Sequence, residues 1–257
     1  MQIDDSHFQL RLAASAQDLH AAQRLRYAVF VDELGADGPM VDHVARREVD
    51  RFDAFVDHLL LIDRRKPEDQ SVVGVYRVMT QSGAAAAGQF YSEQEYDLGP
   101  LRRSGRRLLE LGRSCLHRDY RGGTAMMHLW AGLADYIAAH RIEVMFGVAS
   151  FQGLDPAPLA GPLSLLHHRH LAPPELRPVA RSAGFQRMDL IAQSELDRPT
   201  AIREIPALIK AYLRLGGFVG QGAYCDRAFN CIDVCLVMDV ARIPDKARAI
   251  YQRGGAT

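Results

Sequence analysis

A strand-like segment followed by a turn rich in arginine and glycine lies near the middle of the chain. The strand covers residues 108–117, the turn runs from Arg118 to Gly123, and an amphipathic helix follows to about residue 140. Glycines let a backbone approach an anion, and the N–H groups at the start of a helix can bind one. Neither a G-K-[ST] loop nor G-x-G-x-x-G is present. By itself, the turn therefore fits a phosphate site and an ordinary strand–helix connection equally well.

Glu110 and Arg113 lie in the strand that leads to this turn, within the segment ELGRS. A carboxylate at this position fits a general base, and it equally fits an exposed or salt-bridged strand residue. Residues three apart face opposite sides of a regular strand. A bulge near Gly112 would turn both side chains toward one cleft, because bulges re-aim neighbouring side chains.

The surrounding segments predict one α/β domain around a mixed sheet. A strand at residues 8–12 precedes a helix that Ser15 caps and that ends at residues 35–39, and a polar loop follows to about residue 52. The other expected elements are a hairpin over residues 56–63 and 72–80, a loop at 84–87, a strand at 143–150, a helix at 202–215, and neighbouring strands at 218–225 and 231–240. We expect residues 1–257 to form a single domain with an irregular, partly helical insertion at about 151–185.

Composition narrows the classes of function. The 257 residues include 31 basic and 31 acidic side chains, so the formal net charge is zero. This balance argues against a generic nucleic-acid binder, and no apolar run approaches the roughly 20 residues of a membrane span. The first residues lack the pattern of a secretory signal, so we expect a cytoplasmic protein.

Several candidate chemistries do not fit the residues. The four cysteines are Cys115, Cys225, Cys231 and Cys235; none forms a C-x-x-C pair, and reduced core thiols are favoured over a metal site. His58 and Asp63 form H-x4-D, but residues five apart fall on opposite strand faces. There is no G-x-S-x-G elbow, and the histidines at 167, 168 and 170 lack further ligands at metal-binding spacing. No metal is expected.

A set of charged and aromatic residues with matched spacing resembles the acyl-homoserine-lactone synthase branch of the Gcn5-related acyltransferases. The matching positions are Arg26-x3-Phe30, Asp50-x2-Asp53, Arg77 and Glu110-x2-Arg113, in that order. The conserved tryptophan of that family has no counterpart here, because Trp130 is the only tryptophan. The resemblance implies a Gcn5-related N-acyltransferase fold, with a mixed central sheet flanked by helices and an elaborated C-terminal half. The missing tryptophan argues against lactone synthesis.

A closer resemblance joins the chain to the bacterial L-ornithine Nα-acyltransferases of ornithine-lipid synthesis. It rests on ELGRSCLHRDYR and on residues 209–239, IKAYLRLGGFVGQGAYCDRAFNCIDVCLVMD. The resemblance implies transfer of a 3-hydroxyacyl chain from acyl carrier protein to the α-amino group of ornithine. A glutamine-directed enzyme, a lactone synthase and a non-catalytic acyl-binding protein are the alternatives. The donor carries its own 4'-phosphopantetheine arm, so no dissociable cofactor is implied.

The resemblance also implies roles for individual residues. Glu110 is the expected base, acting directly or through water. Arg26, Arg77 and Arg113 would bind the acceptor carboxylate or order the acidic loop. The acids expected to hold acceptor ammonium groups are Asp50, Asp53 and Glu33. Phe30 and Ser114 complete the substrate site. The residues expected at the donor phosphate are Arg118, Arg121, Gly122, Gly123 and Thr124.

Two surfaces are expected to meet larger partners. The arginines at 102, 103, 106 and 107 could dock the acidic acyl carrier protein, or form a solvated loop. The segment 202–215 has apolar and basic residues at helical spacing. It could lie on the inner membrane as a peripheral contact, or face the core as an amphipathic helix.

Overall fold

The first helix of the computed structural model carries several of the predicted site residues. Ser15 Oγ accepts a hydrogen bond from the Asp18 N–H at 3.1 Å, which confirms the predicted N-cap. Helix α1 covers Ala16–Arg26 and continues as a π-helix over Tyr27–Glu33. Wide π turns are rare and often occur at functional sites. Arg26, Phe30 and Glu33 lie at or within this change of helix type.

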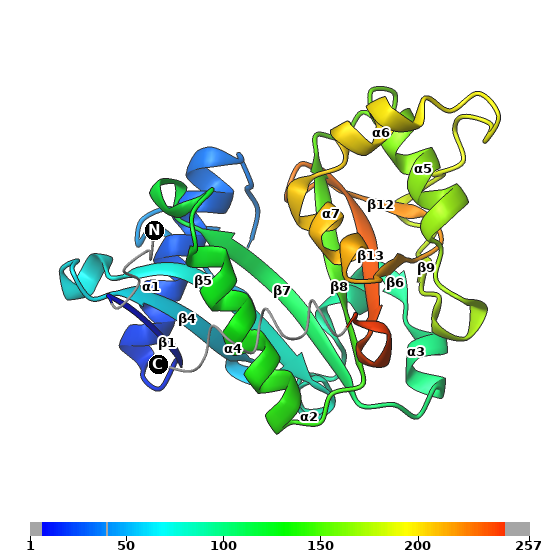
Figure 1. The fold of residues 1–257 in the computed structure, drawn as a ribbon. Helices are drawn as coiled ribbons and strands as arrows, with labels where there is room; N and C mark the ends of the chain where they lie inside the picture. Colours follow the sequence, from blue (N-terminus) through cyan, green and yellow to red (C-terminus); the bar gives the residue numbers. More distant parts are fainter. Residues whose placement is uncertain (1–6, 40, 245–257) are drawn as a thin grey trace. The chain divides into compact units, whose positions relative to one another are not determined.

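The structure describes residues 7–39 and 41–244, which divide into two compact units (Figure 1). Unit 1 contains residues 7–39, 41–87 and 111–141, and unit 2 contains residues 88–110 and 142–244. Besides α1, the elements in chain order are β1 (Phe8–Leu12), β2 (Val41–Asp42), β3 (Arg47–Glu48), β4 (Asp57–Asp63), β5 (Val72–Thr80), α2 (Gln81–Ala87), β6 (Tyr96–Asp97), α3 (Gly99–Arg103), β7 (Leu108–Leu116), α4 (Ala125–Ala139), β8 (Val144–Gln152), α5 (Ala160–His170), β9 (Val179–Ala180), β10 (Phe185–Gln186), α6 (Arg198–Glu204), α7 (Ala207–Arg214), β11 (Phe218–Val219), β12 (Ala223–Asp226) and β13 (Cys231–Asp239).

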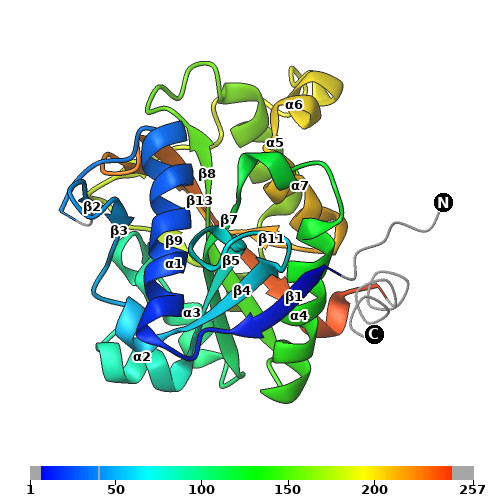
Figure 2. The same cartoon turned by 90° about the vertical axis from the view of Figure 1, so that its left-hand side faces the viewer.

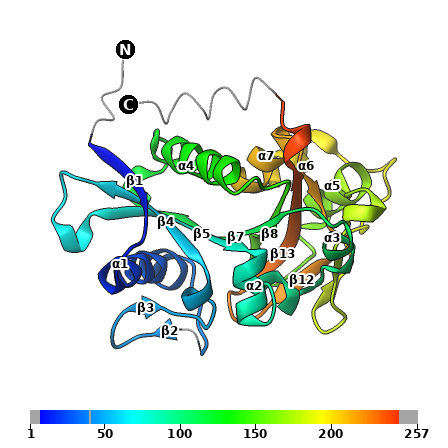
Figure 3. The ribbon, with the colours of Figure 1, turned by 90° about the horizontal axis from the view of Figure 1, so that it is seen from below.

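Unit 1 is a sheet with a helix on each face. Its strand order is β1-β4-β5-β7, and the predicted hairpin is confirmed as the antiparallel pair β4–β5. Figure 3 shows α1 and α4 on opposite faces of the sheet. Leu60 and Ile62 pack toward α1, while Leu59 and Leu61 approach the side of α4, so alternate residues of β4 belong to two apolar layers. The short β2–β3 hairpin lies beside α1 (Figure 2).

Unit 2 is built on β8 and β13, which pair antiparallel over nine residues each. Its strand order is β7-β8-β13-β12-β10, with β11 also on β13. Helix α7 contacts β13, and α5 contacts α6. The β7–β8 pair is parallel and covers only Leu108–Glu110 and Val144–Phe146, so the sheet is mixed, as predicted.

Three local predictions are wrong. Residues 84–87 belong to helix α2, because the alanines there follow helix propensity. The predicted helix 202–215 is split into α6 and α7, because Pro206 forces Ile205 into an extended conformation. The predicted strand 218–225 is interrupted between β11 and β12, and Gly222 there has a φ of +77°.

Two further predictions concern the insertion at residues 151–185 and the domain boundaries. Helix α5 lies within the predicted irregular insertion at 151–185 and accounts for its helical part. The predicted single domain over residues 1–257 includes 1–6 and 245–257, which lie outside the described residues. That domain assignment stays a prediction.

Candidate active site

Three arginines and three carboxylates form a buried ionic network inside unit 1. The side chains of this network are at most 7% exposed, and they are Arg26, Arg77, Arg113, Glu48, Asp50 and Asp53. Their formal charges sum to zero. A buried charge without a partner of opposite charge costs roughly several kcal/mol. Such a network is therefore stable only when each member pairs with an oppositely charged group.

Arg26, the last residue of α1, ties the loop 48–53 to the helix. Its Nη1 donates to Asp53 Oδ1 at 2.7 Å, and its Nη2 donates to the Glu48 carbonyl at 2.8 Å. Its Nε donates to the Glu48 carboxylate. Burial by itself would raise the pKa of Asp53, but Arg26 and Arg77 outweigh burial and lower the pKa.

Asp50 is held between two arginines that come from neighbouring strands. Arg77 Nη1 on β5 donates to its Oδ2, and Arg113 Nη2 on β7 donates to the same oxygen at 3.1 Å. The Phe52 N–H donates to Asp50 Oδ1 at 2.7 Å. Burial raises the pKa of Asp50, yet the two guanidinium groups lower it overall. The motif Asp50-x2-Asp53 therefore places both carboxylates where arginines from three elements converge.

Arg113 reaches the network from a strained backbone position. Its φ is +49°, in the left-handed region that non-glycine residues rarely occupy. Its Nε donates to Glu48 Oε1 at 3.1 Å, in addition to its bond with Asp50. The local departure from an extended strand that we expected near Gly112 thus occurs one residue later. Strain of this kind persists only where surrounding contacts hold it.

Ion pairs join Arg26, Arg77 and Arg113 to protein carboxylates. They order the acidic loop, which was one of the two roles expected for them. Phe30 packs against the core of unit 1, and Ser114 is half-buried in β7. The binding of an acceptor by any of these residues stays a prediction.

Sequence reasoning missed three members or neighbours of this network. Glu48 meets both Arg26 and Arg113, Gln23 Nε2 donates to Asp53 Oδ2 at 2.9 Å, and His58 Nε2 lies 3.9 Å from Asp53 Oδ1. Burial lowers the pKa of His58 to about 4, so its ring is neutral at pH 7. The one available signal was position, since Gln23 stands three residues before Arg26 on the same helical face.

Glu110 belongs to unit 2 and is bound by backbone amides. Its Oε2 accepts from the Tyr91 N–H at 2.7 Å, and its Oε1 accepts from the Ser92 N–H at 2.6 Å. The residue is 3% exposed and lies where β7 pairs with β8. Two donors on one carboxylate fix its position, which a base needs before it can meet an amine.

The arginine–glycine turn lies between β7 and α4 in unit 1. Arg121 Nη1 lies 2.8 Å from Glu33 Oε2, and Arg118 Nε lies 3.5 Å from Glu33 Oε1. Gly122 has a φ of +78° and open space around the position of a Cβ. Thr124 is the N-cap residue of α4. Glu33 is therefore joined to the predicted donor turn, and Asp50 and Asp53 are joined to the buried network.

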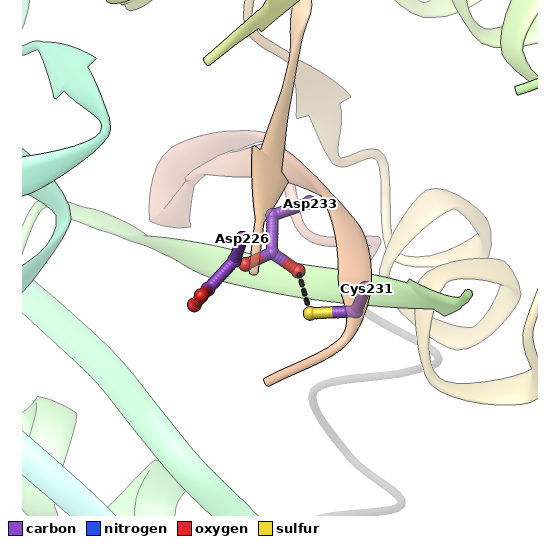
Figure 4. A group of neighbouring side chains, drawn as sticks. All are labelled: Asp226, Cys231 and Asp233. Atoms are coloured by element: carbon purple, nitrogen blue, oxygen red, sulfur yellow. Dashed lines mark hydrogen bonds between the residues drawn. The ribbon is translucent and has the colours of Figure 1, made fainter. Parts of the chain in front are cut away.

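A second group, of two acids and a thiol, lies in unit 2, and Asp226 is its half-buried member. Cys231 Sγ donates to Asp233 Oδ1 at 3.3 Å, and Asp226 stands beside them (Figure 4). One possible ligand atom from each of the three residues lies within 4.8 Å of the others. Burial raises the pKa of Asp233 to about 6, and burial also raises the pKa of the Cys231 thiol. Burial thus shifts both groups toward their neutral forms, in contrast to the arginine-paired carboxylates of unit 1.

The two expected partner surfaces lie in unit 2. Arg102 donates to both oxygens of Glu93, at 2.8 and 2.5 Å, and Arg106 pairs with Asp239 at 2.6 Å. Arg103 and Arg107 are exposed. Ile209 and Tyr212 of α7 are buried, whereas Ile202 of α6 is 48% exposed. Among the described residues no helix is long and apolar enough to span a membrane.

Comparisons with known proteins find relatives of this chain among acyltransferases. A family model described as an acetyltransferase (GNAT) domain matches residues 25–131. The L-ornithine Nα-acyltransferase of Rhodobacter capsulatus is 58% identical over 248 residues, which cover 96% of this chain and 95% of that protein. The protein of the same name from Brucella abortus is 41% identical over 247 residues, 95% of this chain and 88% of that protein.

A solved structure bears on the fold. The structure of a CoA-dependent acyl-homoserine lactone synthase matches with a TM-score of 0.53 and 14% identity, and it covers 96% of this chain and 90% of that one. Together with the family model, this likeness confirms the predicted Gcn5-related fold class.

Proposed function

We propose that this chain, which belongs to the L-ornithine Nα-acyltransferase family, transfers a 3-hydroxyacyl chain from acyl carrier protein to the α-amino group of L-ornithine. Its class, an N-acyltransferase, follows from its relatives and from the GNAT domain. The observation that carries this proposal is 58% identity over 95% of a protein with that name. The product would be a lyso-ornithine lipid. Ornithine is favoured over glutamine because both relatives are named for ornithine.

The reaction requires few groups. A deprotonated α-amine attacks the thioester carbonyl, the N–C bond forms, and the tetrahedral intermediate expels the pantetheine sulfur as the C–S bond breaks. The α-ammonium gives one proton to a base before the attack, and the nitrogen loses a second proton after it, which balances the proton that the leaving thiolate takes up. Approximation of amine and carbonyl contributes much of the rate, because it converts a bimolecular step into an intramolecular one.

Glu110 supports the role of base through its placement. Its carboxylate is fixed by the amides of Tyr91 and Ser92 at 2.7 and 2.6 Å, so it does not need to be ordered when substrate arrives. It would take the proton from the α-ammonium directly or through a water molecule. The buried network supports the fold of unit 1, because it fixes α1, the loop 48–53 and two strands.

The donor would be bound by residues around the arginine–glycine turn between β7 and α4. Arg118, Arg121 and the backbone of Gly122, Gly123 and Thr124 would meet the phosphodiester of the 4'-phosphopantetheine arm. The exposed Arg103 and Arg107 would attract the acidic carrier protein. The arm belongs to the donor, and the proposal involves no dissociable cofactor and no metal. We place the reaction in the cytoplasm, with the lipid product leaving at the inner membrane.

Lipid analysis of a host that makes no ornithine lipid tests the proposal. Expression of this chain should yield a new 3-hydroxyacyl amide of ornithine, identified by mass spectrometry, and expression of Glu110→Gln should yield far less of it. An acyl-homoserine lactone or an acyl-glutamine in its place would contradict the ornithine assignment. Binding of acyl carrier protein without any acylated product would instead favour a non-catalytic protein.

A further inference from the structure

Glu33 occupies an anion position between the two arginines of the donor turn. Its carboxylate lies 2.8 Å from Arg121 Nη1 and 3.5 Å from Arg118 Nε, and its side chain is 15% exposed. Arg121 is fixed from the other side, because its Nε and Nη2 donate to the Leu116 carbonyl at 3.2 and 3.0 Å. The turn also contains Asp119, whose Oδ2 lies 3.6 Å from His117 Nδ1, so the protein supplies two negative charges of its own here.

The charges at the turn therefore suit a donor with a single phosphate charge better than a donor with several. The formal charges of Arg118, Arg121, Asp119 and Glu33 sum to zero, and the start of α4 adds about half a positive charge. A phosphodiester, which joins the pantetheine arm to a carrier protein, carries one negative charge. Coenzyme A carries a pyrophosphate and a further phosphate, so it brings several negative charges toward the Glu33 carboxylate.

We propose that Glu33 selects carrier-protein donors over coenzyme A thioesters by holding one of the two anion positions at this turn. The inference rests on the proposed donor and adds a residue that determines donor choice. Because Arg118 and Arg121 are 64% and 45% exposed, solvent and salt screen the repulsion, and the selectivity is a matter of several-fold.

The test compares Glu33→Gln with Asp32→Asn. Asp32 is the neighbouring acid of the same π-helix, but it pairs with Arg46 at 2.5 Å and does not pair with the turn. Both variants remove one negative charge from the same segment. kcat/KM is measured for one 3-hydroxyacyl chain presented on acyl carrier protein and on coenzyme A, at low and high salt.

Glu33→Gln should raise the ratio of kcat/KM for coenzyme A to kcat/KM for carrier protein about three- to tenfold at low salt, and less at high salt. Asp32→Asn should leave that ratio unchanged. The inference is overturned if the ratio is constant in Glu33→Gln, if both variants shift it equally, or if only the KM for ornithine rises. The last outcome would assign Glu33 to the acceptor ammonium.

Two further results keep the inference separate from the proposed function. If the unmodified enzyme does not acylate ornithine from carrier protein, the proposed function fails; if it does and the ratio is unaffected by Glu33→Gln, only the inference fails. Should Glu33→Gln not fold, Glu33→Asp withdraws the carboxylate from the arginines by one methylene. The same ratio should then rise by a smaller factor, and an unchanged ratio would overturn the inference.

Discussion

Asp53 in unit 1 and Asp233 in unit 2 are both buried carboxylates, but their surroundings differ in charge. Asp53 meets Arg26 and Arg77, and these arginines lower its pKa despite burial. Asp233 meets a thiol and a second acid, Asp226, and burial raises its pKa to about 6. The comparison shows that burial alone favours the protonated acid, and that a guanidinium must be buried with a carboxylate to keep it charged.

The largest expected effect is a loss of stability when an arginine is removed from the buried network of unit 1. Arg26→Met would leave Glu48 and Asp53 without a principal partner, and breaking a buried pair in this way costs about 3–5 kcal/mol. Urea unfolding measures the change in the free energy of unfolding. The control is Arg24→Met, an exposed position on the same helix that should change stability by less than about 0.5 kcal/mol. A loss below about 1 kcal/mol in Arg26→Met would show that the network is not structural.

The second prediction concerns the buried carboxyl of Asp233 in unit 2, whose ionisation is removed by substitution with asparagine. A carboxyl whose pKa is raised on folding stabilises the protein most below its unfolded pKa, and this stabilisation is lost as pH rises through about 6. Asp233→Asn does not titrate, so relative to the unmodified chain it should gain on the order of 3 kcal/mol between pH 4 and pH 8.

Urea unfolding at pH 4 and pH 8 measures this gain. Asp135→Asn, at an exposed position of α4, provides the control and should show little pH-dependent difference. An Asp233→Asn variant that loses stability between pH 4 and pH 8, relative to the unmodified chain, would contradict the direction of the pKa shift.

Glu110 sharpens the comparison, since backbone amides bind this buried carboxylate. Glu110→Gln should lower turnover on the order of 10²-fold or more, while the protein stays folded. Turnover with chemistry as the rate-limiting step checks this, and its pH profile separates a base from a positioning residue. If Glu110 is the base, its substitution should abolish the fall in turnover that the unmodified enzyme shows at acidic pH. Near-normal turnover would exclude Glu110 as the base.

The smallest effect is expected on the surface of unit 2. Arg103→Glu with Arg107→Glu should raise the KM for acyl carrier protein several-fold and weaken its dependence on salt. Arg102 and Arg106 are left unchanged because they pair with Glu93 and Asp239. The KM for ornithine serves as the internal control. If it rises in place of the KM for the carrier protein, these arginines do not form the docking surface.

The sequence predicted those parts of the molecule that local patterns determine. Two apolar, β-branched segments separated by a charged, proline-containing stretch predicted the β4–β5 hairpin, and Ser15 predicted the start of α1. Neighbours in sequence create both features. Pro206 also breaks its helix locally, but the helical spacing on both sides hid the interruption.

The site was only partly predictable because its contacts are long-range. The spacing of Arg26, Asp50, Asp53, Arg77 and Arg113 matched a family motif, yet spacing alone did not show that these residues neutralise one another. Glu48 was missed because its partners lie 22 and 65 residues away. The amides that hold Glu110 carry no side-chain signal at all, since any residue at positions 91 and 92 except proline supplies an N–H.

The most direct test of the account is the identity of the acylated product. Purified chain is supplied with 3-hydroxyacyl–acyl carrier protein and equal concentrations of ornithine and glutamine, and the products are fragmented by mass spectrometry. The account predicts one main product, ornithine acylated on its α-nitrogen, with release of free carrier-protein thiol in equal amount. Acyl-glutamine as the main product, a lactone, or thiol release without any amide would contradict it.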